Sequence, residues 1–257
     1  MNFVRSLAFA LALLLVAAPL RAEQIHVAAA ADLRFALDEI VSLFRKARPA
    51  DSIEVSYGSS GKLYAQILNG APFDLFFSAD IELAEKLVQA GLAVPKVRPY
   101  ALGRIVVWRP GGEARPLALA DLAQPEIRRI AIANPKHAPY GMRAVEALKA
   151  AQVWEALESR LVHGENIAQT AQFVQTGNAD VGIIALSLAL APTFAGTGSY
   201  TLIPAEYHQP LRQGFVISKR AENNALAGAF AVFFTSSDVR QIMSRYGFSI
   251  PGGPAEH

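Results

Sequence analysis

Hydrophobic and polar positions alternate along the chain in blocks that predict strands and helices in turn. Short apolar runs predict buried strands, and stretches with apolar positions three and four residues apart predict amphipathic helices. In the first part of the chain these blocks are Gln24–Ala30, Leu33–Phe44, Ile53–Tyr57, Gly61–Leu68, Asp74–Ser78 and Ile81–Ala90. The alternation is typical of an α/β fold in which helices cover a mostly parallel sheet.

A second series of strands and helices follows one long apolar segment. That segment, Tyr100–Trp108, predicts a single strand that ends in a polar turn. The second series then comprises Ile130–Ala133, Tyr140–Ala151, Val153–Leu161, Ile167–Gln175, Val181–Ala185 and Tyr200–Ile203. The last part of the chain predicts one strand, Gln213–Ser218, and two helices, Ala225–Phe234 and Asp238–Tyr246.

The first residues have the pattern of a secretory signal peptide. Arg5 precedes the apolar run Leu7–Val16, and small residues lead to a cleavage site after Ala22. The run is shorter than the roughly 20 apolar residues that a membrane-spanning helix needs. We therefore expect residues 1–22 to be removed and the mature protein to be a soluble protein of the periplasm.

The length of the mature chain predicts two lobes. Roughly 235 residues exceed the usual size of one domain, and the segment after Gln213 is too short to fold by itself. We expect lobe I to comprise residues 23–102 and 215–257, and lobe II residues 103–214. The strands Tyr100–Trp108 and Gln213–Ser218 would then hinge a ligand cleft, in which ligands lie beyond the carboxyl ends of the strands.

Cysteine content and charge exclude several classes of protein. The 257 residues contain no cysteine, which excludes a disulfide framework, a thiolate metal site and a lipidated cysteine. Without Arg5 and Arg21, 22 basic residues balance 22 acidic ones. This balance gives no electrostatic footprint for nucleic acid. We expect no nucleic-acid partner, no cofactor and a monomeric protein.

Four predicted helix starts, two in each lobe, can form an anion site. They lie in the segments Ala28–Leu33, Ser59–Gly61, Asn134–Gly141 and Gly164–Ala168. The first amides of a helix have no partner within the helix and carry a partial positive charge, which contributes roughly 0.3–1 kcal/mol at each exposed end. Four such ends, together with serine hydroxyls, can hold a tetrahedral dianion without lysine or arginine.

Several segments together resemble the periplasmic molybdate-binding proteins that serve ATP-binding-cassette importers. The segments are Ala29–Ala31, Gly58–Gly61, Ala71–Asp80, Asn134–Gly141 and Arg245–Phe248. The resemblance covers essentially the whole mature chain and implies a two-lobed, type II solute-binding fold. It also implies molybdate or tungstate as the ligand, a membrane permease as the partner, and ligand contacts from Ser60, Tyr140 and the amide of Ile167.

The chain departs from this family's pattern at Asp32, where many members have serine, and at Ala185, where several supply a tyrosine. Like charges about 4 Å apart repel by roughly 4 kcal/mol at an effective dielectric constant near 20. Asp32 therefore caps a helix with its carboxylate turned away, binds as the neutral acid, accepts a proton from a protonated oxyanion, or coordinates the metal centre. We favour the cap, because aspartate is a preferred N-cap residue, and retain Asp32 as a candidate ligand residue.

Two other functions are weighed against molybdate binding. Asp32 leaves open a protein of the same fold that binds another oxyanion, such as phosphate. A secreted serine hydrolase that uses Ser60 is the least favoured alternative, because Lys62 breaks the Gly-x-Ser-x-Gly pattern of a nucleophile elbow. A nucleotide-binding loop is excluded because Ser56 stands at its first glycine and Leu63 follows Lys62. We expect a binding protein and not an enzyme.

Overall fold

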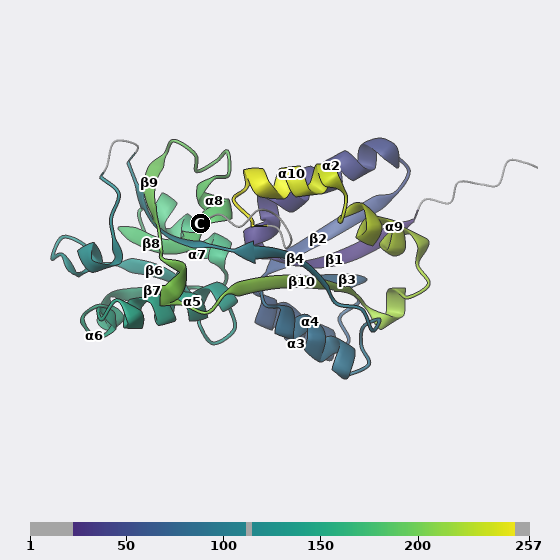
Figure 1. Cartoon of the computed structure of the whole chain (residues 1–257), viewed down its shortest axis with the longest axis horizontal. Coiled ribbons are helices and arrows are strands. Elements are labelled where there is room, and N and C mark those ends of the chain that lie inside the picture. The colour runs from purple at the N-terminus through teal and green to yellow at the C-terminus, as the bar shows by residue number, and fades with distance from the viewer. Residues whose placement is uncertain (1–22, 112–114, 250–257) are drawn as a thin grey trace, which may run out of the picture.

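The computed structural model describes residues 23–111 and 115–249, which form two five-stranded sheets, each covered by helices. Figure 1 shows the two bodies side by side, and we call them lobe I and lobe II. The predicted signal peptide, residues 1–22, lies outside the described residues. Within the described ranges, no helix has the length and apolar character needed to cross a bilayer.

Lobe I contains the strand order β2-β1-β3-β10-β4. The strands β1, β2 and β3 are parallel, and β10 pairs antiparallel with both β3 and β4. Its elements are β1 (Gln24–Ala30), η1 (Ala31–Leu33), α2 (Arg34–Ala47), β2 (Ser52–Gly58), α3 (Ser60–Leu68), β3 (Leu75–Ser78), α4 (Ile81–Gln89), β4 (Arg98–Gly103), β10 (Leu211–Ile217), η5 (Lys219–Ala221), α9 (Ala225–Phe233) and α10 (Ser237–Arg245).

Lobe II repeats this arrangement with the order β7-β6-β8-β5-β9. The strands β6, β7 and β8 are parallel, and β5 pairs antiparallel with β8 and β9. Its elements are β5 (Ile105–Pro110), η2 (Leu119–Ala123), β6 (Ile130–Ala133), α5 (Pro139–Ala150), α6 (Trp154–Leu157), η3 (Glu158–Arg160), β7 (Leu161–Gly164), α7 (Ile167–Gln175), β8 (Val181–Ala185), α8 (Leu186–Ala189), β9 (Gly198–Leu202) and η4 (Ala205–Tyr207). The predicted α/β fold is confirmed, although both sheets are mixed rather than mostly parallel.

The side chains of β1 alternate between the two faces of the lobe I sheet, as the period of a strand requires. Val27 and Ala29 belong to the larger apolar cluster, which includes Leu37 of α2 and Phe230 of α9. Ala28 belongs to a separate cluster with residues of α3 and α4. The C-terminal helices thus pack on the face of the first sheet that carries α2 (Figure 1).

The chain crosses between the lobes twice. The predicted single strand Tyr100–Trp108 is wrong, because the chain leaves the first sheet at Gly103 and enters the second at Ile105. The return runs from β9, which ends at Leu202, to β10, which begins at Leu211 in the first sheet. The lobe boundaries given above stay a prediction, and the change of sheet at both crossings supports them in outline.

One predicted helix is also wrong. The segment Val153–Leu161 forms only the short helix α6 and the turn η3, and then Leu161 opens strand β7. Strand β7 pairs with β6 in parallel, so its backbone N–H and C=O groups form hydrogen bonds with the neighbouring strand and not within a helix. It ends at Gly164, just before helix α7, and this places the start of α7 at the same edge of the sheet as the start of α5.

Candidate functional site

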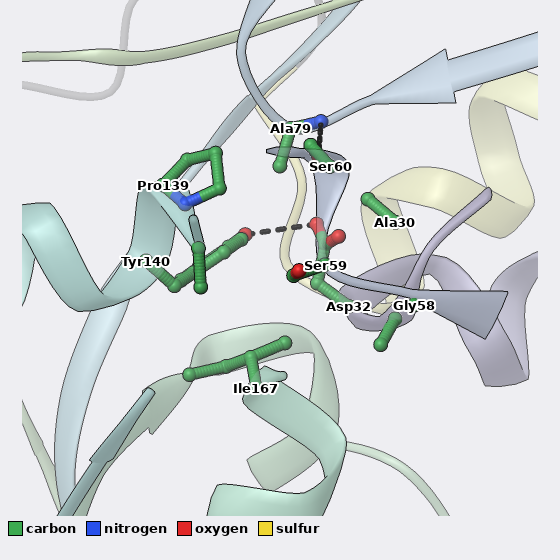
Figure 2. A pocket seen from close by; sticks show the side chains of 11 residues that line it. Ala30, Asp32, Gly58, Ser59, Ser60, Ala79, Pro139, Tyr140 and Ile167 are labelled. Atoms are coloured by element: carbon green, nitrogen blue, oxygen red, sulfur yellow. Dashed lines mark hydrogen bonds between the residues drawn. The ribbon is translucent and has the colours of Figure 1, made fainter. Parts of the chain in front are cut away.

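A small cavity of about 10 Å³, close to the space that one water molecule needs, lies between the lobes where several helices begin. This volume is far below the roughly 300–1,000 Å³ of pockets that hold drug-sized molecules, so lobes this close leave room for a very small ligand only. Its lining comes from the end of β1 and η1, the turn between β2 and α3, Ala79, and the starts of α5 and α7: residues Ala30, Ala31, Asp32, Gly58, Ser59, Ser60, Ala79, Ala138, Pro139, Tyr140 and Ile167 (Figure 2). All four predicted site residues line it.

The starts of α3, α5 and α7 lie at this cavity. Asn166 caps α7 through its Oδ1, which accepts bonds of 3.0 Å from the amides of Ala168 and Gln169. The amide of Ile167, the first residue of α7, is not among the amides that this cap satisfies. Helix α5 has no side-chain cap at Ala138 and begins with Pro139. These ends favour an anion, because first-turn amides and the helix dipole attract negative charge.

The Ser60 hydroxyl group donates to no acceptor among the residues that the structure describes. Its side chain is buried, and Oγ accepts a bond of 3.0 Å from the amide of Ala79. A hydroxyl group that accepts in this way can still donate its own hydrogen. Ser60 is therefore held in place by Ala79 and free to donate to a ligand oxygen in the cavity.

Asp32 lies at the centre of a buried network that joins the lobes. Its Oδ2 accepts a bond of 2.9 Å from the Tyr140 hydroxyl and one of 2.7 Å from Nε2 of Gln213, which also lies 3.1 Å from the Tyr140 oxygen. The Ser187 hydroxyl donates to the backbone oxygen of Asp32 over 2.8 Å. Figure 2 shows the bond between Tyr140 and Asp32 across the cavity.

The interpretation of Asp32 as a helix cap is wrong. The cap positions are Ala30 for η1 and Leu33 for α2, and neither helix has a side-chain cap bond. The carboxyl group instead faces Tyr140 and Gln213, which both donate to Oδ2, and the side chain is only 1% exposed. An acidic side chain therefore belongs to the cavity itself.

Burial changes the titration of both partners in this network. Desolvation raises the pKa of Asp32 from 3.8 to about 6, although the bonds from Gln213 and Tyr140 and the nearby backbone amides of Asp32 and Leu33 act in the opposite direction. Burial, followed by the charge of Asp32, raises the pKa of Tyr140 well above its usual value. Tyr140 thus stays protonated and donates, while Asp32 changes charge near pH 6.

Further contacts hold the lobes together at the edge of the cavity. The amide of Gly61 donates to the backbone oxygen of His137 over 2.9 Å, and Ser59 Oγ lies 2.8 Å from Nδ1 of the same histidine. Lys62 forms an exposed ion pair with Glu165 in the other lobe. A side-chain carbon at Gly61 would lie 2.5 Å from the His137 oxygen, so this approach of the lobes requires glycine. The structure therefore has the lobes closed on each other.

The fold and the cavity define a two-lobed solute-binding protein. The sequence model of the family described as bacterial extracellular solute-binding protein matches residues 25–249. The chain belongs to this family, which confirms that it is a binding protein and not an enzyme. The serine hydrolase alternative is therefore dropped.

Relatives and solved structures agree with this assignment. The molybdate-binding protein ModA of Rhodobacter capsulatus is 35% identical over 250 residues, which cover 95% of this chain and 96% of that protein. The structure of the Azotobacter vinelandii periplasmic molybdate-binding protein matches with a TM-score of 0.81 and 32% identity, covering 88% of this chain and 99% of that one. The sulfate-binding protein SubI of Mycobacterium tuberculosis H37Rv, at 16% identity and a TM-score of 0.74, shares the fold. The resemblance seen in the sequence is thus confirmed.

Two residues of the site were not predicted from the sequence. Gln213 lies in β10, is fully buried, and bonds to both Asp32 and Tyr140. Ser187 lies at the start of α8, a helix that the apolar pattern did not indicate. The sequence offered one signal for Gln213: it is a glutamine at the start of a predicted buried strand, and a buried polar side chain needs a hydrogen-bond partner.

Proposed function

We propose that this protein is the periplasmic binding component of an ATP-binding-cassette importer and captures molybdate or tungstate. The observation that carries the proposal is a small cavity between two closed lobes, lined by helix starts and hydroxyl groups and by no lysine or arginine among the described residues. Two relatives at 35% identity bear the name molybdate-binding protein. The bound anion would be held by dipoles and hydrogen bonds instead of by an opposite charge.

In this proposal each lobe contributes part of the ligand shell. Ser60 of lobe I donates its hydroxyl hydrogen, and the amide of Ile167 in lobe II donates from the opposite side. Tyr140 and Asp32 complete the shell, and they link the lobes through their own bond of 2.9 Å. Because donors from both lobes share one anion, the closed form is favoured when the ligand is bound. A membrane permease then distinguishes the loaded protein from the empty one by its shape.

The remaining parts of the proposal concern the protein's location and assembly. Export through residues 1–22 would deliver the mature chain to the periplasm, where a monomer would exchange its ligand with the permease. No resident cofactor is needed, because molybdate or tungstate is the cargo. The family and the signal-peptide pattern at the start of the sequence support the proposed location.

A thermal-shift titration of the mature protein tests the proposed ligand. Molybdate and tungstate should each raise the melting temperature in proportion to RT ln(1 + [L]/Kd), because they bind the folded form alone. Sulfate and phosphate serve as tetrahedral controls and should raise it much less. A melting temperature that responds to phosphate but to neither metal oxyanion would overturn the proposed ligand.

A further inference from the structure

The two oxygen atoms of the Asp32 carboxyl group have different surroundings. Oδ2 accepts from Tyr140 and from Gln213, whereas Oδ1 is buried and has no hydrogen-bond partner among the described residues. The whole side chain is 1% exposed and lines the cavity. An unpartnered buried carboxylate oxygen costs free energy, so Oδ1 requires a hydrogen-bond partner inside the cavity.

A dianion cannot be that partner while Asp32 is ionised. Two like charges about 4 Å apart repel by roughly 4 kcal/mol at an effective dielectric constant near 20. No lysine or arginine among the described residues lines the cavity to offset this repulsion. A proton between Oδ1 and the nearest ligand oxygen removes the repulsion and makes a hydrogen bond at the same atom.

The hydrogen bonds at Oδ2 determine which oxygen of the protonated acid carries the hydrogen. The carbonyl oxygen of a carboxylic acid accepts hydrogen bonds, and the hydroxyl oxygen donates one. Tyr140 and Gln213 both donate to Oδ2 and so fix it as the carbonyl oxygen. The hydrogen is then on Oδ1, where it has no competing acceptor in the protein.

We propose that the oxyanion is bound together with one proton, which is taken from solvent and held on Oδ1 of Asp32, so that the neutral acid donates a hydrogen bond to the anion. This inference rests on the proposed function and specifies the protonation state of the same site. No bond of the ligand changes: Asp32 gains one proton, and the complex carries one negative charge fewer than its separate ionised parts.

The ionisable groups around Asp32 do not supply another source of this proton. Tyr140 of α5 and Tyr100 of β4 face it, and burial keeps the pKa of both phenols well above the usual value. Helices α7 and α8, which pack against η1, contain no ionisable side chain. Arg34 of α2 lies over the ring of Tyr57, and Lys62 of α3 pairs with Glu165. The ring of His137 lies 2.8 Å from Ser59 Oγ at the edge of the cavity, and burial lowers its pKa, so it is largely uncharged at pH 7.5 and has no extra proton to give. Solvent is therefore the donor.

The pKa of Asp32 in the ligand-free protein makes the proton uptake on binding measurable near neutral pH. Burial raises the pKa of Asp32 to about 6, so the empty site is mostly ionised at pH 7.5. A bound dianion raises the pKa of a neighbouring carboxyl group further, because it disfavours the second negative charge. Binding at pH 7.5 should therefore take up close to one proton from solvent, and the uptake should fall to about half near pH 6.

Calorimetric titration with sodium molybdate in two buffers of different ionisation enthalpy measures this uptake. The matched variant is Asp32→Asn, in which the amide oxygen can accept from Tyr140 and Gln213 and the NH₂ group takes the place of Oδ1–H. We expect the wild type to take up close to one proton and its Kd to rise about tenfold per pH unit from pH 7 to pH 8. The variant should bind with no uptake and a flat pH profile.

Each other outcome contradicts the inference in a different way. Tight binding by the wild type without proton uptake means that Asp32 stays ionised beside the ligand. Loss of binding in Asp32→Asn, with uptake retained in the wild type, means that the carboxylate accepts a proton carried by the ligand. Absence of molybdate binding in both proteins overturns the proposed function, and the inference with it.

Discussion

The hydroxyl group of Tyr140 donates to Oδ2 of Asp32 over 2.9 Å, and this bond joins helix α5 of lobe II to the turn η1 that follows the first strand of lobe I. Both side chains are almost fully buried, and the residues are separated by more than a hundred positions in the sequence. The bond gives the closed arrangement a polar contact that forms only when the lobes meet.

Replacement of Tyr140 by phenylalanine should destabilise the protein. Tyr140→Phe removes one donor from a buried carboxylate, which costs about 1–3 kcal/mol of unfolding free energy. Urea unfolding at pH 7.5, where Asp32 is mostly ionised, measures the loss. Tyr200→Phe is the matched control, since that side chain is 38% exposed. Equal stability of the two variants would show that the bond to Asp32 contributes nothing.

Ser60 should matter for binding more than for stability. Ser60→Ala removes a hydroxyl donor to a charged ligand, and we expect affinity for molybdate to fall by about 1.5–3 kcal/mol, or roughly ten- to 150-fold. Calorimetric titration measures the change, with the exposed Ser244→Ala as the control. An unchanged Kd in Ser60→Ala would mean that the hydroxyl only accepts the bond from Ala79.

Gly61 tests whether closure is needed for tight binding. Alanine at this helical position suits α3 itself, but its side-chain carbon would lie 2.5 Å from the backbone oxygen of His137 in the other lobe. Gly61→Ala should therefore fold normally, weaken molybdate binding by at least about tenfold (~1.4 kcal/mol), and show a smaller ligand-induced decrease in radius of gyration by small-angle scattering.

The control for Gly61→Ala is Gly228→Ala, because a side-chain carbon there has no atom within 4 Å. Gly228 also lies within a helix, so the intrinsic gain in helix propensity is similar in both variants. Binding by Gly61→Ala that equals binding by Gly228→Ala would contradict the role given to the closed form.

The titration of Asp32 should also affect the stability of the ligand-free protein. Burial raises its pKa to about 6 in the folded protein, against an ordinary value of 3.8, so the folded protein binds more protons than the unfolded chain between these two pH values. The contribution of Asp32 to the free energy of unfolding is thus fully present below about pH 4, and it is lost as the pH rises through about 6. Asp32→Asn should raise the melting temperature relative to wild type at pH 7.5 and less so near pH 4. A difference independent of pH would contradict the buried titration.

Much of the fold could be predicted because strand and helix periods are local properties. The run Ile130–Ala133 and the apolar spacing in α2 each gave the correct element. The break between Gly103 and Ile105 could not be predicted, because both halves of Tyr100–Trp108 suit a strand and only the tertiary structure assigns them to different sheets. Strand β7 was missed because its residues also fit a continuing helix.

The candidate site was predictable where helix starts define it. Ser60, Tyr140 and Ile167 follow strands in the sequence, and the carboxyl edges of two sheets bring them to one cavity. The orientation of Asp32 was not predictable, since its partners Ser187 and Gln213 lie 155 and 181 positions further along the chain. The pairing of β10 with β4 also shifts between Gln213 and Gly214, so the side that Gln213 faces does not follow from simple alternation.

The most direct test of the account is a crystal structure of the mature protein grown with sodium molybdate and measured at the molybdenum absorption edge. The account predicts one anomalous peak per chain, inside the cavity between the lobes, with a ligand oxygen within hydrogen-bond distance of Ser60 Oγ and another near the amide of Ile167. An anomalous peak elsewhere on the protein, or an empty cavity in crystals soaked at saturating molybdate, would contradict it.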